Sequence, residues 1–222
     1  MKAILSYTIY TLLALFSSLR AQSFYGTAQY DLKLYEDAFY FEATLAFNNK
    51  ASVFTYKQHP GPVWARIEEE RFKSQWIRTD SLGHIVYRRY DRPTIQVRSF
   101  CREGEPMVYE DLLRIDWQLG NREETIQGLP CKNAHATFRG RKYEAWYTLQ
   151  VPLGVGPWKF FGLPGLIVKI SDQKQEISIL LRNLALHQGE SQVSTYLPGA
   201  TISREDFYTC LDEEWVISYE KK

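Results

Sequence analysis

The sequence lacks the short motifs that mark common catalytic and cofactor sites. It contains no Gly-x-Ser-x-Gly, no His-Glu-x-x-His, no phosphate-binding loop ending in Gly-Lys-Ser/Thr and no Cys-x-x-Cys pair. Its four histidines are scattered singly, and none has a second histidine or cysteine at the spacing of a metal site. We therefore predict no metal, no cofactor and no catalytic residue, and we favour a protein that is not an enzyme.

The sequence also lacks an excess of charge of either sign. Its 27 Lys and Arg residues nearly balance 26 Asp and Glu residues, so the formal net charge is +1. A near-neutral chain without a long basic run gives no electrostatic reason to bind nucleic acid. Hydrophobic residues at 45% and aromatic residues at 15% exclude a disordered chain and predict a globular, aromatic-rich body.

Charge is absent from the stretch Ala3 to Leu19, which follows Lys2 and precedes Arg20 and Ala21. A basic start, a short apolar run and a small residue at the expected cut predict a secretory signal peptide that is cleaved after Ala21. The run is at the short limit for a membrane span. We expect residues 1–21 to be removed and residues 22–222 to form a single domain that is periplasmic or secreted, with no stable membrane span.

Cysteine is scarce, because the chain has only Cys101, Cys131 and Cys210. In an exported chain an odd number allows one disulfide and one free or intermolecular thiol. Cys101 and Cys131 both fall in the predicted β-rich part, whereas Cys210 falls in a helical pattern. We therefore predict that Cys101 pairs with Cys131.

Alternation of apolar and polar residues dominates the rest of the chain. Phe24 to Leu34 has the period of two that is typical of a half-buried strand, and Phe41 to Phe47 repeats it before a turn at Asn48–Asn49. Further strands are predicted at residues 51–57, 85–87, 94–100, 106–109, 115–119, 124–129, 134–138, 142–151, 166–170 and 176–186. Turns are expected at 120–121 and 139–140, while residues 63–78 fit either a strand or a short helix.

A short helix is predicted only near the C-terminus. Ser203 followed by the acidic residues 205–206 resembles an N-cap with an acidic first turn, and apolar residues follow at helical spacing. The fold class is therefore mainly β: an antiparallel meander with a short C-terminal helix. The alternation leaves three architectures open, namely a sandwich, a barrel and an open half-barrel.

Glycine and proline concentrate between Pro152 and Gly165, where they alternate with Trp158, Phe160 and Phe161. Glycine permits unusual backbone torsions and proline fixes them, so the backbone of this stretch is strongly specified. One interpretation is a shaped crossover whose aromatic residues seal one end of the fold. The other is a binding lip for a peptide strand or an apolar ligand. We favour the crossover.

The same stretch carries a family resemblance. Its motif residues are Gly156, Pro157, Gly162, Leu163, Pro164, Gly165, Leu166 and Ile167. From about residue 115 to residue 170 the chain resembles the GLPGLI family of secreted Bacteroidetes proteins. The resemblance implies a largely uncharacterised family with an expected association with TonB-dependent outer-membrane receptors.

Two basic runs, Arg88–Arg92 and Arg139–Lys142, are candidates for binding a carboxylate or phosphate. The alternative, which we favour, is that they are exposed charges at strand ends that discourage aggregation. The candidate binding residues from the loop and its basic neighbours are Trp146, Trp158, Phe160, Phe161, Arg139 and Arg141.

The leading functional hypothesis is an exported cell-envelope protein that binds a partner or ligand and assists outer-membrane uptake. Its expected partner is an outer-membrane receptor, a peptide or an apolar small molecule. A secreted hydrolase with dispersed carboxylates is the second hypothesis, and it gains if Glu144 or Asp116 meets another acid beside Trp146. A structural envelope component is the third, and it gains if the interior is solid and the loop is buried.

Overall fold

The computed structural model describes residues 23–34, 39–58, 80–101 and 104–210. The predictions for residues 1–21 and 63–78 lie outside these ranges. The elements are β1 (Phe24–Leu34), β2 (Phe39–Phe47), β3 (Ala51–Gln58), β4 (His84–Arg89), β5 (Thr94–Phe100), β6 (Pro106–Leu112), β7 (Gln118–Ile126), β8 (Leu129–Phe138), β9 (Arg141–Thr148), β10 (Leu166–Asp172), β11 (Ile177–Gln188), β12 (Ala200–Thr201) and α2 (Arg204–Cys210).

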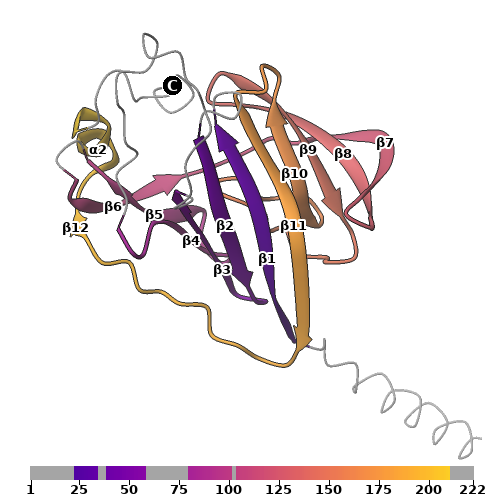
Figure 1. Cartoon of the computed structure of the whole chain (residues 1–222), viewed down its shortest axis with the longest axis horizontal. Coiled ribbons are helices and arrows are strands. Elements are labelled where there is room, and N and C mark those ends of the chain that lie inside the picture. Colours follow the sequence, from indigo (N-terminus) through magenta and orange to yellow (C-terminus); the bar gives the residue numbers. More distant parts are fainter. Residues whose placement is uncertain (1–22, 35–38, 59–79, 102–103, 211–222) are drawn as a thin grey trace, which may run out of the picture.

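The strands form one 12-stranded sheet in the order β12-β6-β5-β4-β3-β2-β1-β11-β10-β9-β8-β7. Every pairing is antiparallel except that of β12 with β6, which is parallel. Figure 1 shows the strands fanning out from β12 and β6 at one end to β7 at the other. Among the described residues no pairing joins these two edges, so the sheet is open. The predicted mainly β fold with a short C-terminal helix is confirmed.

Strand β1 shows how the alternation in the sequence builds this sheet. Ala28, Tyr30 and Leu32 are buried on one face, while Thr27 and Gln29 on the other face are exposed. Because β1 pairs with β2 on one side and β11 on the other, the first and last long strands meet in the middle of the sheet. The N-terminal hairpin is thereby joined to the C-terminal part of the chain.

The two halves of the sheet share one hydrophobic core. Phe54 of β3 and Val97 of β5 belong to the same buried cluster as Tyr143 of β9. Tyr30 Oη of β1 donates a hydrogen bond of 2.8 Å to the carbonyl oxygen of Ile167 in β10. The sheet therefore curves around its interior, and both halves contribute side chains to it.

The glycine- and proline-rich loop, residues 149–165, connects β9 to β10 and packs into this core. Val155 is 1% exposed, Phe160 is fully buried and Trp158 is 9% exposed. Ile167 N donates a hydrogen bond of 3.0 Å to the carbonyl oxygen of Val155, so the loop also joins the backbone of β10. The loop is a packed crossover that fills the interior of the curved sheet.

The predicted turn at residues 120–121 is wrong. Strand β7 continues through these residues with a bulge between Leu119 and Glu123, and the hairpin turns instead at Gln127 and Gly128, where φ is 50° and 77°. Only glycine fits at position 120 in this bulge, because a Cβ there would lie 2.2 Å from Oδ1 of Asn133. Glycine at this position allows close approach to a buried side chain rather than a reversal of the chain.

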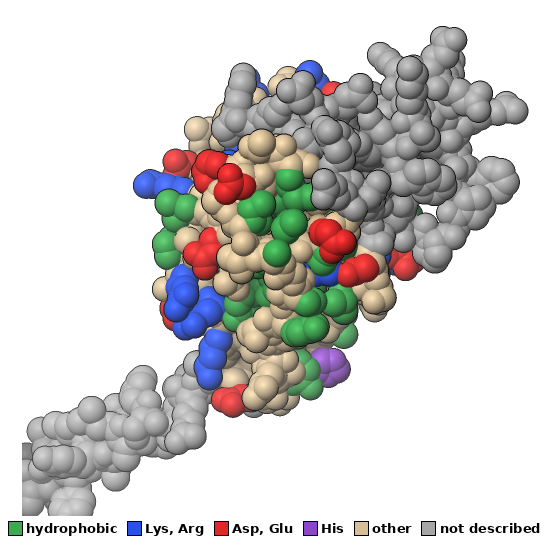
Figure 2. Space-filling view, turned by 90° about the vertical axis from the view of Figure 1, so that its left-hand side faces the viewer, with side chains coloured by type: hydrophobic (Ala, Val, Ile, Leu, Met, Phe, Trp, Pro, Cys, Tyr) green, Lys and Arg blue, Asp and Glu red, His purple; other side chains and the backbone are tan. Residues whose placement is uncertain are grey.

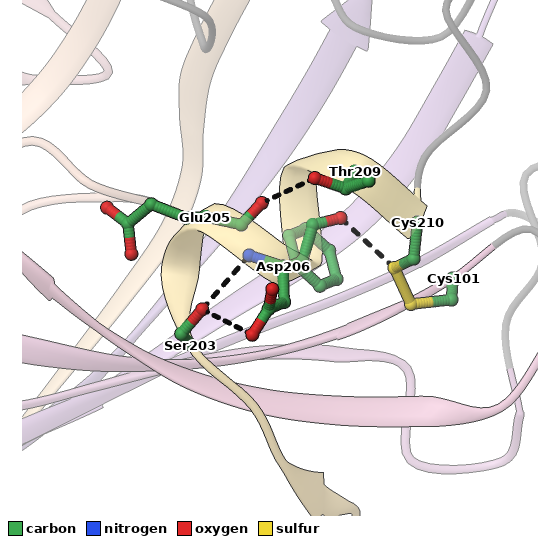
Figure 3. The surroundings of a disulfide bond; sticks show 7 residues. Cys101, Ser203, Glu205, Asp206, Thr209 and Cys210 are labelled. Carbon is green, nitrogen blue, oxygen red and sulfur yellow. Dashed lines mark hydrogen bonds between the residues drawn. A yellow bond between two sulfur atoms is a disulfide. The ribbon is translucent and has the colours of Figure 1, made fainter.

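The predicted Cys101–Cys131 disulfide is also wrong. The disulfide joins Cys101 to Cys210, whose Cα atoms are 5.3 Å apart (Figure 3). Cys101 directly follows β5, and Cys210 ends helix α2, which packs on the neighbouring strand β6. Cys131 lies in β8, near the opposite edge of the sheet from β5, and is a free, buried thiol. Burial raises the pKa of Cys131, so its thiol stays protonated and unreactive.

Helix α2 is capped as the sequence predicts. Asp206 N donates a hydrogen bond of 3.0 Å to Ser203 Oγ, and Ser203 Oγ donates one of 2.7 Å to the Asp206 carboxylate (Figure 3). Phe207 is 2% exposed and stacks on Tyr109 of β6 with ring centroids 4.5 Å apart. The cap, the stacked rings and the disulfide together hold the helix on the sheet.

The described surface on the side of β12, β6 and α2 is chemically mixed. In Figure 2 hydrophobic, basic and acidic side chains are interspersed on this face, and no large area of one charge stands out among the coloured atoms. This agrees with the near-neutral composition of the chain.

Replacing Gly165 by alanine should destabilise the fold. A Cβ at this position would lie 2.1 Å from the carbonyl oxygen of Thr148, so the backbone of the crossover must move. We expect the free energy of unfolding to fall by about 3 kcal/mol, measured by urea denaturation. The matched control is Gly128→Ala, where φ is 77° but no atom lies within 4 Å, and about 1 kcal/mol is expected. Equal effects at the two glycines would contradict the packing of the crossover.

Peptide mapping without reduction should recover Cys101 linked to Cys210 and Cys131 as a free thiol. Cys210→Ser should lower the free energy of unfolding by about 2 to 5 kcal/mol, because the disulfide closes a long loop of the chain. Alkylation of Cys131 should require denaturant, since the side chain is 2% exposed. A Cys101–Cys131 peptide, or rapid alkylation of Cys131 in the native protein, would contradict this pairing.

Candidate functional site

A buried carboxylate gathers charged side chains from several parts of the chain. Asp111, at the inner face of β6, accepts a hydrogen bond of 2.5 Å from Arg139 Nη2. Lys159 Nζ in the crossover lies 3.9 Å from the same carboxylate, and Arg204 Nε of helix α2 lies 3.3 Å from it. The Asp111 cluster, defined by these four residues, therefore joins β6, the β8–β9 turn, the crossover and the helix.

Three of the four side chains in the Asp111 cluster are almost completely removed from water. The side chains of Asp111, Lys159 and Arg139 are 3%, 2% and 8% exposed, while that of Arg204 is 30% exposed. Lys159 Nζ also donates a hydrogen bond of 3.3 Å to Tyr109 Oη. Buried charges of this kind depend on close partners, so the cluster fixes the parts that it joins. We interpret it as a structural junction.

A different arginine lies at the rim of the crossover. Arg88, at the end of β4, shares the inward parity of Val86, which is buried. Its Nη1 donates a hydrogen bond of 3.1 Å to the carbonyl oxygen of Gly154. Its guanidinium carbon lies 3.9 Å from the ring centroid of Phe161 and 5.0 Å from that of Tyr90. Arg88 thus holds the rim of the loop against β4.

The rim of the crossover is more exposed than its centre. Phe161 is half-buried, and Gly162 and Pro164 are exposed. The carbonyl oxygen of Phe161 accepts a hydrogen bond of 2.8 Å from Trp117 Nε1, which fixes the backbone next to the exposed glycine. This rim, defined by Arg88, Tyr90, Phe161 and Gly162, is the part of the loop that a ligand could reach.

A second polar group lies on the outer face of β7, β8 and β9. The backbone N–H of Arg122 donates a hydrogen bond of 3.0 Å to Oδ1 of Asn133, which turns the Asn133 amide nitrogen toward His135 Nε2, 3.0 Å away. The Glu144 carboxylate forms an ion pair with Arg122 and lies 3.8 Å from His135. The guanidinium of Arg122 also lies over the ring of Trp146, at 5.2 Å.

This outer-face group has limited catalytic potential. The side chains of Asn133 and His135 are in hydrogen-bonding contact, and both lie near the Glu144 carboxylate. A histidine beside a carboxylate could move a proton, but the described hydrogen-bond partners of the group include no serine, threonine or cysteine. We interpret the group as the polar support of the β7 bulge.

The structure separates the sequence-predicted binding residues. Trp158 and Phe160 are buried inside the crossover, and only Phe161 reaches the rim. Trp146 is 5% exposed and belongs to the outer face of the sheet. The two arginines are engaged elsewhere: Arg139 in the Asp111 cluster, and Arg141 in ion pairs with Asp172 at 2.7 Å and Glu176 at 2.5 Å.

Three charged residues of the interior were missed as individual candidates: Arg88, Asp111 and Lys159. A signal was present for two of them. Arg88 lies two positions after Val86 in β4, and Asp111 lies two positions after Tyr109 in β6, so strand parity turns both toward the core. A charged residue on the inward face of a strand therefore pointed to a buried interaction. Lys159 lies in the crossover, where no such period applies.

The described ranges offer neither a metal-binding cluster nor a membrane-spanning helix. No group of three His, Cys, Asp or Glu side chains in these ranges is arranged to hold a metal ion. No helix within them combines the length and apolar character needed to cross a membrane.

Comparison with known proteins gives a family match without a known activity. Residues 108–169 match the model of a family described as "Protein of unknown function (Porph_ging)". The matched segment runs from β6 into β10 and includes the crossover and the Gly162–Ile167 motif. No curated protein matches the chain.

Solved structures similar to this chain show its fold. PNGF-II in space group C2 superposes with a TM-score of 0.56 at 10% identity, over 86% of this chain and 32% of that one. PNGF-II in space group P21 gives a TM-score of 0.52 at 12% identity, over 83% and 31%. This chain therefore spans about a third of the length of PNGF-II. At such low identity the likeness concerns the fold alone.

Replacing Asp111 by asparagine should strongly destabilise the protein. The change removes the carboxylate between Arg139, Lys159 and Arg204, while these side chains stay in place. We expect the free energy of unfolding to fall by about 3 kcal/mol or more, measured by denaturant titration. Asp116→Asn is the control, because that side chain is 80% exposed, and its effect should stay within about 0.5 kcal/mol. Equal denaturation midpoints for the two variants would rule out the structural junction.

Proposed function

We propose that this chain is an exported cell-envelope protein that binds a ligand or partner at the rim of its crossover, and that it is not an enzyme. Its predicted signal peptide and its resemblance to the GLPGLI family support export. The family resemblance makes a TonB-dependent outer-membrane receptor the expected partner. The family match at residues 108–169 includes the crossover, which carries the proposed binding rim.

One observation carries the proposal: the interior of the sheet is occupied by the chain's own loop, whereas the rim of that loop is accessible. Phe160 is fully buried, but Phe161 is only half-buried and Gly162 is exposed. An aromatic ring beside exposed backbone and a cation is typical of a recognition surface, because it offers apolar contact and oriented hydrogen bonds together. Binding at the rim does not require an internal cavity.

The burial of most of the crossover favours a second candidate, a structural envelope component. Val155 and Phe160 have the burial expected of a loop that only completes the core. The hydrolase hypothesis is less well supported, because neither of the two acids on which it depends lies beside a second acid. Glu144 meets Arg122 and His135 rather than a second acid, and Asp116 is an exposed partner of Arg114.

Native mass spectrometry of the mature protein from its own envelope fraction tests the proposal. We expect a bound small molecule or partner on the wild type, and we expect Phe161→Ala to lose it because the ring of the rim is removed. The matched control is Leu149→Ala, since Leu149 lies in the same loop and is 52% exposed. This variant should keep the bound mass.

A wild-type protein that is bare in every preparation would support the structural candidate instead. Retention of the bound mass by Phe161→Ala, with loss in Leu149→Ala, would move the binding surface away from the rim. Thermal unfolding of both variants provides the check on folding, since a large stability loss in either would change occupancy without any direct contact.

A further inference from the structure

Arg88 differs from Arg139, which pairs with Asp111, in having no acidic partner among the residues that the structure describes. The described residues give Arg88 one hydrogen bond, to the carbonyl oxygen of Gly154, and ring contacts with Phe161 and Tyr90. Asp111, by contrast, has close partners of opposite charge. Burying a guanidinium without a counter-ion costs free energy, so such a residue is a candidate for a binding role.

The neighbouring residues do not supply the missing negative charge. Arg89 is bound to Asp91 through a hydrogen bond of 3.0 Å on the exposed side of the chain, so that carboxylate is already used. Burial raises the pKa of Tyr90 to about 12, and its hydroxyl donates a hydrogen bond of 2.9 Å to Ala51, so the phenol is neutral at physiological pH. Burial also lowers the pKa of Arg88, as expected for a cation whose charge is poorly compensated.

The guanidinium of Arg88 keeps donors for a ligand. Only Nη1 has a hydrogen-bond partner among the described residues, and neither Nε nor Nη2 is a buried unsatisfied atom. These two nitrogens are therefore not fully buried, although Arg88 as a whole is half-buried. Nε and Nη2 form one edge of the planar group, which is the edge that binds the two oxygens of a carboxylate in parallel.

The surroundings hold this edge in a defined orientation. The Gly154 carbonyl that accepts from Arg88 also accepts a hydrogen bond of 3.2 Å from Gly162 N, and the Phe161 carbonyl is held by Trp117. Phe161 stacks on the guanidinium at 3.9 Å. A cation that is already positioned loses little freedom when a ligand arrives.

We infer that Arg88 and Phe161 form a binding site for a carboxylate attached to an apolar body. Within the described rim Arg88 supplies one positive charge, which matches the single charge of a carboxylate, whereas a phosphate with two charges usually draws on further cations or several backbone N–H groups. The rings of Phe161 and Tyr90 provide the apolar contact beside the charged edge. This inference rests on the proposed function, since it names the ligand class of the same rim.

Ligand-observed NMR on the purified mature protein tests the site, with benzoate as the carboxylate probe and benzamide as its neutral match. We expect benzoate to bind the wild type in clear preference to benzamide and to inorganic phosphate. Arg88→Gln should weaken benzoate binding by about tenfold or more, because a charge-assisted bidentate contact is lost. Arg89→Gln, which changes the adjacent exposed arginine, should bind benzoate like the wild type.

Arg88→Lys provides a second variant if Arg88→Gln fails to fold. It keeps the positive charge but lacks the planar fork, so benzoate binding should weaken while benzamide binding stays unchanged. Equal binding of benzoate and benzamide by the wild type, undiminished benzoate binding by Arg88→Gln, or tighter binding of phosphate than of benzoate would each overturn the inference.

The probe experiment and the envelope experiment fail in different ways. Benzoate binding is measured on purified protein with added probe, so it does not depend on what the cell supplies. A bare envelope protein that binds benzoate through Arg88 would refute constitutive binding and keep the site. An envelope protein with a bound mass but no response to benzoate would keep the proposed function and refute the carboxylate site.

Discussion

The fold depends on one buried carboxylate. Asp111 lies within ion-pairing distance of Arg139, Lys159 and Arg204, which come from a hairpin turn, the crossover and the C-terminal helix. These segments are distant in sequence, and β6 and β8 lie far apart in the strand order of the open sheet. Removal of a carboxylate from among buried cations leaves their charges uncompensated in a water-poor interior, which is strongly destabilising. The cluster therefore supplies an attachment between parts of the sheet that no strand pairing joins.

The crossover fills the inner face of the open, curved sheet. Many open, curved sheets could hold a ligand on the inner face, but here Phe160 and Val155 occupy that space. The same loop presents Phe161 and Gly162 at its rim, next to Arg88. One stretch of chain thus completes the core and forms the proposed recognition surface, which accounts for the concentration of glycine, proline and aromatic residues within it.

Strand alternation and helix capping could be predicted because they are local. The prediction for Phe24–Leu34 matches β1, that for Thr94–Phe100 matches β5, and Ser203 caps α2. The prediction failed where a distant atom decided the local structure. Gly120 lies in a bulge rather than a turn, and glycine is required there because the side chain of Asn133 occupies the space that a Cβ would need. The positions of the candidate site residues could not be predicted for a similar reason, since aromatic composition does not reveal that Phe160 is buried and Phe161 is at the rim.

The sequence by itself determined the mainly β class, the short C-terminal helix and the special backbone of the crossover, because periodicity, capping and glycine–proline content act over a few residues. Only the tertiary structure decided that Cys101 bonds to Cys210, that Arg139 and Arg141 form buried ion pairs, and that Arg88 has no carboxylate partner among the described residues. Those outcomes depend on strand order and sheet curvature. Long-range pairing sets both, and the period-2 pattern is the same for strands in any order.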